Sequence, residues 1–236
     1  MTARLFLALD TVHVAQAQAQ AQATRGLVDG IKLGLEFFAA HGPAGVRQVV
    51  DGKTPLFLDL KLHDIPNTVA GAVRATAALG PELLTVHAAG GGAMLRAAVD
   101  AAGEAAAKAG QTRPRIVAVT VLTSLAEGDL ETVGQRGPVG DQARRLAALA
   151  QASGVDGVVC SPHEIAPLRA ACGSGFLLVV PGIRPGWAAA NDQKRIMTPA
   201  EATRLGADCL VIGRPITAAD DPAAAARRVA AEIAAA

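Results

Sequence analysis

Opposite charges stand close together in a leucine-rich segment of the chain, where Asp59, Lys61 and Asp64 interrupt the run from Phe57 to Ile65. On a β-strand the leucines at 58, 60 and 62 would share one face, and Asp59 and Lys61 the other. Buried ionised groups are expensive unless paired, and a buried pair is weak evidence for stability. The spacing therefore predicts an active site. A salt bridge that joins a strand end to its neighbour is the alternative reading of the same spacing.

Two further ionisable residues fit the same site. Lys32 follows Gly30 in an apolar context, where an unpaired ammonium would be costly, so it requires a carboxylate partner, for which Asp59 is the natural candidate. Asp10 follows the first apolar run and either joins the site or caps the first helix, since aspartate is a preferred N-cap residue.

The elements that position these residues form a regular alternation. Short β-type runs lie at 4–9, 30–33, 56–61, 83–86, 115–119, 157–160, 177–180 and 209–212, with segments of helical composition between them. This order predicts parallel strands with right-handed crossovers in a single-domain (β/α)8 TIM barrel that spans residues 1–236. No GxGxxG motif follows the first run, which argues against a dinucleotide-binding fold.

Polar residues recur at the carboxyl ends of these runs, which is the functional face of such a barrel. They are Asp10, Lys32, Asp59, Lys61, Asp64, His87, Thr120, Thr123, Ser124, Ser161, Arg184, Gly213 and Arg214. His87 could equally be a hydrogen-bonded core histidine. His63 alternates away from Lys61 and is predicted to pack against a helix.

The last two strand ends favour a phosphate. Gly213 and Arg214 lead into Pro215 at a predicted helix start, where backbone N–H groups and a guanidinium can hold an anion. Arg184 ends the preceding run and supplies the other wall. An ordinary turn with a surface arginine is the alternative. The aperiodic segment from 185 to 197, which contains Trp187 and Gln193, is predicted to be a lid over that phosphate.

Composition excludes several classes of protein. The formal net charge is +1, which provides no global field for nucleic acid or an anionic membrane. No apolar run approaches the ~20 residues that cross a bilayer, and the N-terminus lacks a signal-peptide layout, so a cytoplasmic location is expected. Cys160, Cys172 and Cys209 show no zinc-like or CxxC spacing and are predicted to be reduced thiols.

Taken together, the motifs resemble the bacterial orotidine 5′-phosphate decarboxylase family over essentially the whole chain. The matching segments are residues 7–10, 31–34, 59–68, 86–91, 121–124, 181–184 and 213–216. The ordered set is more specific than any one motif. The resemblance implies a homodimer with shared active sites that converts orotidine 5′-monophosphate to UMP, the last step of de novo pyrimidine nucleotide synthesis, without metal or organic cofactor.

The resemblance also implies a role for each residue. Lys61 matches the proton donor to C6 of the pyrimidine, within an alternating charge network of Lys32, Asp59, Lys61 and the Asp64 of the partner subunit. The residues that it assigns to substrate binding are Asp10, Lys32, Asp59, Thr68 from the partner, Thr123, Ser124, Arg184, Gln193, Gly213 and Arg214.

The chemistry of decarboxylation suits these residue types. Loss of CO2 leaves a carbanion in the plane of the ring, which the π system cannot delocalise, so its stabilisation must be electrostatic. Two other functions fit parts of the pattern. A barrel with the same DxKxxD element could act on sugar phosphates such as hexulose 6-phosphate with Mg²⁺, or the chain could bind nucleotides without catalysis.

Overall fold

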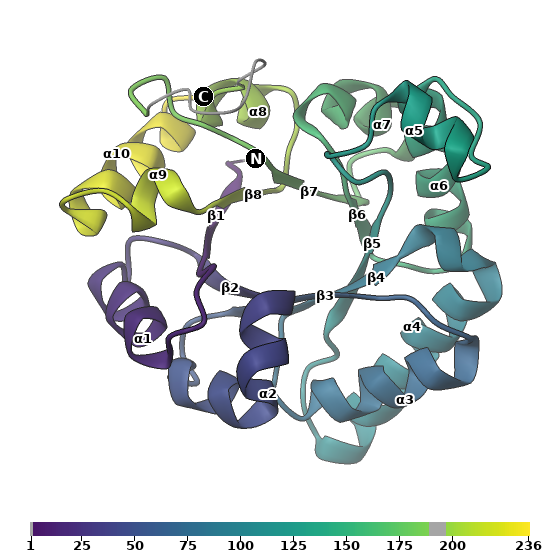
Figure 1. Ribbon diagram of the computed structural model, residues 1–236, viewed down its shortest axis with the longest axis horizontal. Coiled ribbons are helices and arrows are strands. Elements are labelled where there is room, and N and C mark those ends of the chain that lie inside the picture. The colour runs from purple at the N-terminus through teal and green to yellow at the C-terminus, as the bar shows by residue number, and fades with distance from the viewer. Residues whose placement is uncertain (1, 189–196) are drawn as a thin grey trace.

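Eight parallel strands close into a barrel in the computed structural model, which describes residues 2–188 and 197–236 (Figure 1). The strands are β1 (Arg4–Ala8), β2 (Gly30–Gly34), β3 (Leu56–Leu62), β4 (Leu83–His87), β5 (Arg115–Val119), β6 (Gly157–Val159), β7 (Leu177–Pro181) and β8 (Cys209–Ile212). Each strand pairs with the next, and β8 pairs with β1. The predicted (β/α)8 barrel is confirmed, and every predicted strand boundary lies within one residue of the observed one.

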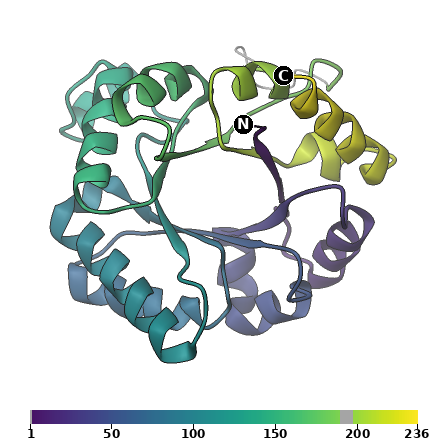
Figure 2. The same ribbon diagram turned by 180° about the vertical axis from the view of Figure 1, so that it is seen from behind.

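Helices surround the barrel on its outer side, as both ribbon views show (Figures 1 and 2). They are α1 (Val14–Ala23), α2 (Leu35–Val49), α3 (Pro66–Ala77), η1 (Ala88–Gly90), α4 (Gly91–Ala109), α5 (Glu127–Thr132), α6 (Val139–Ala152), η2 (Pro162–Glu164), α7 (Ile165–Cys172), α8 (Pro199–Arg204), α9 (Arg214–Thr217) and α10 (Pro222–Ala234). No helix of the described chain is both long and apolar enough to cross a membrane.

The barrel interior is filled by side chains from alternate strand positions. Phe6 of β1 and Phe57 of β3 meet edge to face there, with ring centroids 5.9 Å apart. A Cβ atom at Gly30 would lie 2.3 Å from the Phe6 ring, so the glycine of β2 makes room for the aromatic ring. The layer between strands and helices consists mainly of buried Ala, Val, Leu and Ile, as the low aromatic content predicts.

Aspartates join neighbouring strands at the amino-terminal rim of the barrel. Asp29, Asp156 and Asp208 each precede a strand, and each accepts a hydrogen bond of 2.7 Å from a backbone N–H of the strand before it. The donors are Leu5, Ile116 and Leu178. Arg113 and Arg169 pair with two of these carboxylates, and Arg4 pairs with Glu82 across the same rim. This rim is built for stability, which leaves the opposite rim for chemistry.

Candidate active site

Four charged side chains of alternating sign meet at the carboxyl ends of β1, β2 and β3. Lys61 Nζ lies 2.8 Å from both carboxylate oxygens of Asp59. Lys32 Nζ lies 3.6 Å from Asp59 Oδ2 and 3.2 Å from Asp10 Oδ1. The predicted pairing of Lys32 with Asp59 is confirmed. Asp10 bonds Lys32 and does not cap α1, whose N-cap residue is His13.

The network is largely withdrawn from solvent. The exposed fractions of the side chains are 10% for Lys32, 15% for Asp59 and 30% for Lys61, whereas Asp10 is 63% exposed at the outer edge. A Cβ atom at Gly34 would lie 3.1 Å from Lys32 Nζ, so the glycine leaves room for the ammonium group. Charges held in a partly dry site interact more strongly than the same charges in water.

Strand β3 presents Asp59 and Lys61 because its side chains alternate between the two faces. Leu58 and Leu60 lie on one face, as predicted, and this face packs in the layer under the helices. The pairing of β3 with β4 is irregular near the end of β3, because the register shifts between Leu58 and Leu62. Lys61 has φ = 49°, the one positive φ among the non-glycine residues that the structure describes. Its backbone N–H donates to Thr85 Oγ1 at 2.8 Å.

Thr85 of β4 is a site residue that the sequence patterns missed. Its side chain is buried, and its hydroxyl also donates to Asp59 Oδ1 at 3.0 Å. In the sequence, Thr85 resembles an ordinary β-branched strand residue, since threonine favours strands. The available signal was that it is the one polar residue within the apolar run at 83–86.

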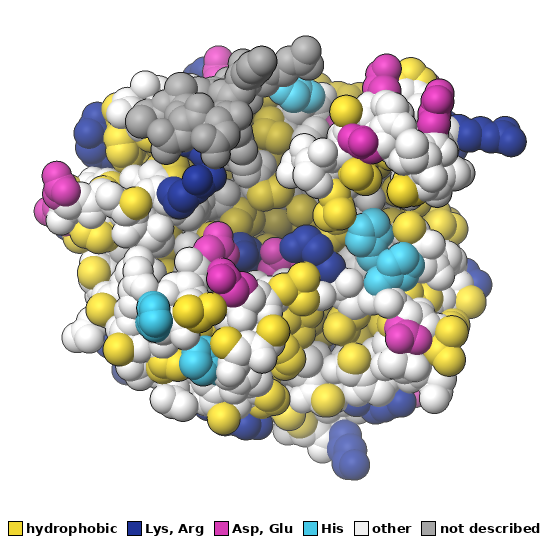
Figure 3. Space-filling view, viewed as in Figure 1, with side chains coloured by type: hydrophobic (Ala, Val, Ile, Leu, Met, Phe, Trp, Pro, Cys, Tyr) yellow, Lys and Arg dark blue, Asp and Glu magenta, His cyan; other side chains and the backbone are white. Residues whose placement is uncertain are grey.

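A small apolar cavity of about 190 Å³ opens beside the network. Figure 3 shows this face of the molecule, with basic and acidic side chains gathered over a hollow floored by hydrophobic ones. The lining residues are Lys32, Phe57, Asp59, Lys61, Val119, Val121, Leu122, Thr123, Val159, Cys160, Pro181 and Val211. Thr123 lines the cavity and Ser124 does not, although both residues are exposed.

The predicted phosphate residues end the last two strands. Arg214 begins α9 with an exposed side chain, one residue before the predicted start at Pro215. A Cβ atom at Gly213 would lie 3.6 Å from Asp10 Oδ2, which places this turn beside the network. Arg184 is buried and follows the end of β7 by three residues. Gln193 lies outside the described residues.

Asp64 and Thr68 are exposed and stand apart from the network of their own chain. Asp64 Oδ1 accepts a hydrogen bond from the adjacent Ile65 N–H at 2.6 Å and forms no ion pair with any residue that the structure describes. Ile65 is itself 67% exposed, and Leu35, at the start of α2, is 54% exposed.

His63 follows the end of β3 and lies beside η1. It stacks on His87, with ring centroids 5.2 Å apart, and a Cβ atom at Gly90 of η1 would lie 3.2 Å from its Cδ2, so it faces a helix as predicted, although its side chain is exposed. The strand ends at Leu62, and beyond that point alternation no longer assigns faces. His87 Nδ1 accepts a weak hydrogen bond of 3.4 Å from Ala89 N–H. Burial, followed by the nearby charges of His63 and Lys61, lowers the pKa of His87.

Trp187 is held by the last helix. Its indole Nε1–H donates to Glu232 Oε1 at 2.8 Å, and the Arg228 guanidinium lies 4.2 Å from the ring centroid. The backbone near it is also tied, because Ile183 forms a bridge with Met197. Residues 189–196 of the predicted lid lie outside the described residues.

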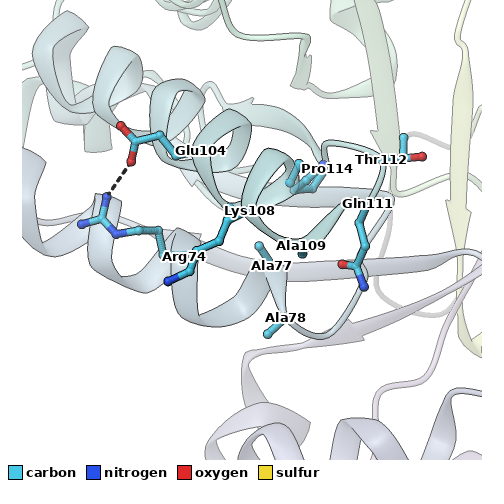
Figure 4. Close-up of a pocket in the computed structure, with 11 residues that line it drawn as sticks. Arg74, Ala77, Ala78, Glu104, Lys108, Ala109, Gln111, Thr112 and Pro114 are labelled. Carbon is cyan, nitrogen blue, oxygen red and sulfur yellow. Dashed lines mark hydrogen bonds and ion pairs between the residues drawn. The ribbon is translucent and has the colours of Figure 1, made fainter.

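A larger cavity of about 490 Å³ lies between α3 and α4 (Figure 4). Alanines form much of its wall, and Arg74 and Glu104 pair across its edge at 3.4 Å. None of the strand-end residues lines it. The cavity beside Lys61 is therefore the better candidate, since it combines apolar walls with converging charges.

Comparison of the sequence with known proteins identifies the family to which the chain belongs. The model of the Orotidine 5'-phosphate decarboxylase / HUMPS family matches residues 3–229. The chain belongs to this family. An orotidine 5'-phosphate decarboxylase of Paramagnetospirillum magneticum is 58% identical, with 97% of each chain covered, and one of Rhodospirillum rubrum is 57% identical, with 97% of this chain and 93% of the relative covered.

Solved structures of the family share the fold. The crystal structure of orotidine 5'-phosphate decarboxylase from Lactobacillus acidophilus superposes with a TM-score of 0.86 at 38% sequence identity, covering 98% of this chain and 99% of the other. Family membership agrees with the resemblance inferred from the strand-end residues.

Proposed function

We propose that the chain decarboxylates orotidine 5′-monophosphate to UMP, the last step of de novo pyrimidine nucleotide synthesis, in the cytoplasm. The observation that carries the proposal is the sequence of contacts Asp10–Lys32–Asp59–Lys61 beside an apolar cavity at the mouth of the barrel. Relatives that are more than half identical over nearly the full chain bear the name of this enzyme.

Lys61 is the proton donor in this proposal. The bond between C6 and the carboxylate carbon breaks, CO2 leaves, and the electron pair remains at C6. The ammonium of Lys61 stabilises this charge and then transfers a proton to C6, and solvent restores the lysine proton. Asp59 holds the ammonium in place through both of its oxygens.

Binding of the rest of the nucleotide follows the geometry of the strand ends. Arg184, Gly213 and Arg214, with Gln193, hold the phosphate, for which a guanidinium and exposed N–H groups are suited. Asp10 and Lys32 contact the ribose. Thr123 contacts the pyrimidine, because it lines the cavity, whereas Ser124, which does not line it, has the lesser role.

The active unit in this proposal is a homodimer with shared sites. Asp64 and Thr68 are exposed beside the site, and Asp64 has no cationic partner among the described residues of its own chain. Exposed Ile65 and Leu35 on the same rim provide apolar surface for a partner subunit. Across the interface, Asp64 would complete the alternating charges beside Lys61.

The reaction needs no metal or organic cofactor in this proposal. The oxygens of Asp59 already face the ammonium groups of Lys61 and Lys32, which would repel a divalent cation placed beside them. The second candidate function is the magnesium-dependent reaction on hexulose 6-phosphate. That reaction needs carboxylate oxygens that are free to bind the metal.

An ultraviolet assay that follows loss of orotidine 5′-monophosphate, with and without EDTA, tests the proposal. We expect turnover that EDTA leaves unchanged. Complete loss of turnover in EDTA would favour the sugar phosphate reaction. Equilibrium binding of UMP without any turnover would identify a nucleotide-binding protein that is not an enzyme.

A further inference from the structure

We propose that Thr85 is a positioning residue for Lys61 and Asp59, and that its hydroxyl sets the geometry of the proton donor. The inference rests on the proposed function for its kinetic consequence, but its structural part does not. Thr85 lies on β4, one strand away from the residues that it would hold.

The hydroxyl of Thr85 uses its hydrogen-bonding capacity on two functional groups at once. A hydroxyl has one hydrogen to donate and lone pairs to accept with. The Lys61 N–H must donate, so Thr85 Oγ1 accepts there, at 2.8 Å. The one hydroxyl hydrogen is then directed to Asp59 Oδ1, at 3.0 Å. With an exposed fraction of 0%, the side chain has no water to replace either contact.

The contact with Lys61 lies where the β3–β4 pairing is irregular. The β3–β4 pairing runs regularly through Leu58, shifts, and resumes at Leu62. At the irregularity the Lys61 N–H has the Thr85 side chain as its partner, at a residue whose φ of 49° is unfavourable for any residue with a Cβ atom. Such a conformation persists only where surrounding contacts enforce it.

Together these contacts close a ring of interactions. Lys61 N–H bonds Thr85 Oγ1, Thr85 Oγ1 bonds Asp59 Oδ1, and the Asp59 carboxylate bonds Lys61 Nζ. The Thr85 hydroxyl oxygen therefore bonds the Lys61 backbone directly and positions the Lys61 ammonium through Asp59. Removing that oxygen frees the carboxylate to rotate and leaves a backbone N–H without its partner, so the ammonium loses its fixed place beside C6.

The test compares Thr85→Val, which keeps the shape but removes the hydroxyl, with Thr85→Ser, which keeps the hydroxyl. We expect Thr85→Val to lower kcat at least tenfold while the Kd for UMP changes less than threefold. Thr85→Ser should restore kcat to within threefold of the parent. Thr76→Val is the matched control, because Thr76 is also buried and hydrogen-bonded but lies on α3, and its kcat should stay within twofold.

A second measurement does not depend on turnover. Hydrogen exchange at the Lys61 amide should be at least tenfold faster in Thr85→Val than in the parent, and slow again in Thr85→Ser. Unchanged protection in Thr85→Val, or a kcat within threefold of the parent, would overturn the assignment. A serine variant as impaired as the valine variant would also overturn it, by assigning the role to packing.

The parent chain is measured in the same assay. If the parent does not decarboxylate orotidine 5′-monophosphate, the proposed function fails, and the exchange data still decide whether Thr85 holds the Lys61 backbone. If the parent is active and the valine variant equals it, the inference about Thr85 fails alone.

Discussion

Lys61 combines a charged side chain with a backbone conformation that glycine normally adopts. Its φ of 49° turns the chain out of regular β3 geometry at the point where the ammonium meets both oxygens of Asp59. Left-handed backbone in a non-glycine residue often accompanies functional sites, where surrounding contacts maintain it. We infer that this backbone conformation helps to place the ammonium beside Asp59.

Lys61→Ala should abolish decarboxylation while the Kd for UMP stays within tenfold of the parent. The loss of kcat should exceed the ~10²–10⁴ that a simple general acid contributes, because the same group also stabilises the carbanion. Steady-state kinetics and isothermal titration with UMP measure the two quantities. A variant that keeps a tenth of the parent kcat would rule out Lys61 as the proton donor.

The His87 imidazole should titrate below its ordinary value of 6.5, because burial and the neighbouring His63 and Lys61 disfavour its protonated form. Since the folded-state pKa is the lower one, the unfolded chain binds more protons between the two values. The free energy of unfolding therefore falls as the pH is lowered from 6.5 through the folded pKa.

NMR titration of the imidazole Cε1–H measures this pKa, and denaturant unfolding between pH 5 and 8 measures the stability. His63→Asn should move the His87 midpoint upward, because the stacked neighbour contributes to the shift. A midpoint at or above 6.5 in the parent would contradict the environment described for His87.

At the level of single residues, the sequence was a better guide to ion pairs than to hydrogen bonds between neutral and charged side chains. Lys32 required a carboxylate because of its apolar surroundings, and Asp59 is indeed that partner. Thr85 could not be found by the same reasoning, because a threonine in a strand needs no explanation until its neighbours are known. His63 faces the short helix η1, as predicted, but its side chain is exposed rather than packed, because the strand ends at Leu62.

Secondary structure elements carry the phosphate residues to the same rim as the charges. β7 ends beside Arg184, and β8 passes through Gly213 directly into α9. Neither element contributes to the charge network itself. In the proposed function, the charged groups of the first three strands therefore act on the reacting ring, and the residues after the last two strands hold the phosphate.

Arg214→Ala should therefore weaken binding of phosphorylated substrate and leave the phosphate-free nucleoside unaffected. We expect kcat/KM for orotidine 5′-monophosphate to fall by 10- to 100-fold, in line with the loss of roughly 1.5–3 kcal/mol from a hydrogen bond to a charged group. Arg47→Ala, at an exposed position in the last turn of α2, is the matched control. Equal impairment with both substrates would exclude Arg214 as the phosphate ligand.

The strands were more predictable than the short helices. Each strand is a compact apolar run with clear boundaries, so its position follows from composition. α5 was not predicted, because a helix of six residues carries too little periodicity to be recognised, whereas the start of α9 was predicted from Pro215. The same turn was predicted to be an anion site from Gly213 and Arg214, and this remains a prediction.

Across the whole molecule, aspartate performs different tasks at the two ends of the barrel. At the amino-terminal rim, Asp29, Asp156 and Asp208 accept backbone N–H groups and hold strands together. At the carboxyl rim, Asp59 faces two ammonium groups. Asp64, on the same rim, remains for a partner subunit in the proposed dimer.

Mixing two inactive variants tests the shared site. Lys61→Ala and Asp64→Ala homodimers should each be nearly inactive, whereas subunit exchange creates heterodimers with one intact site in two. Random reassortment makes half of the dimers mixed, so about a quarter of the parent activity should return. A control mixture of two differently tagged Lys61→Ala preparations should recover none. Exchange that is confirmed by native mass spectrometry without any recovery would disprove a contribution of Asp64 across the interface.

The clamp on Trp187 gives the molecule a built-in optical reporter. Trp187 is the single tryptophan of a chain without tyrosine, so nearly all intrinsic emission comes from one indole. That indole is stacked against Arg228 and bonded to Glu232, both on α10. Its fluorescence therefore reports the docking of the C-terminal helix against the segment after β7. Detachment of α10 becomes visible spectroscopically without any added label.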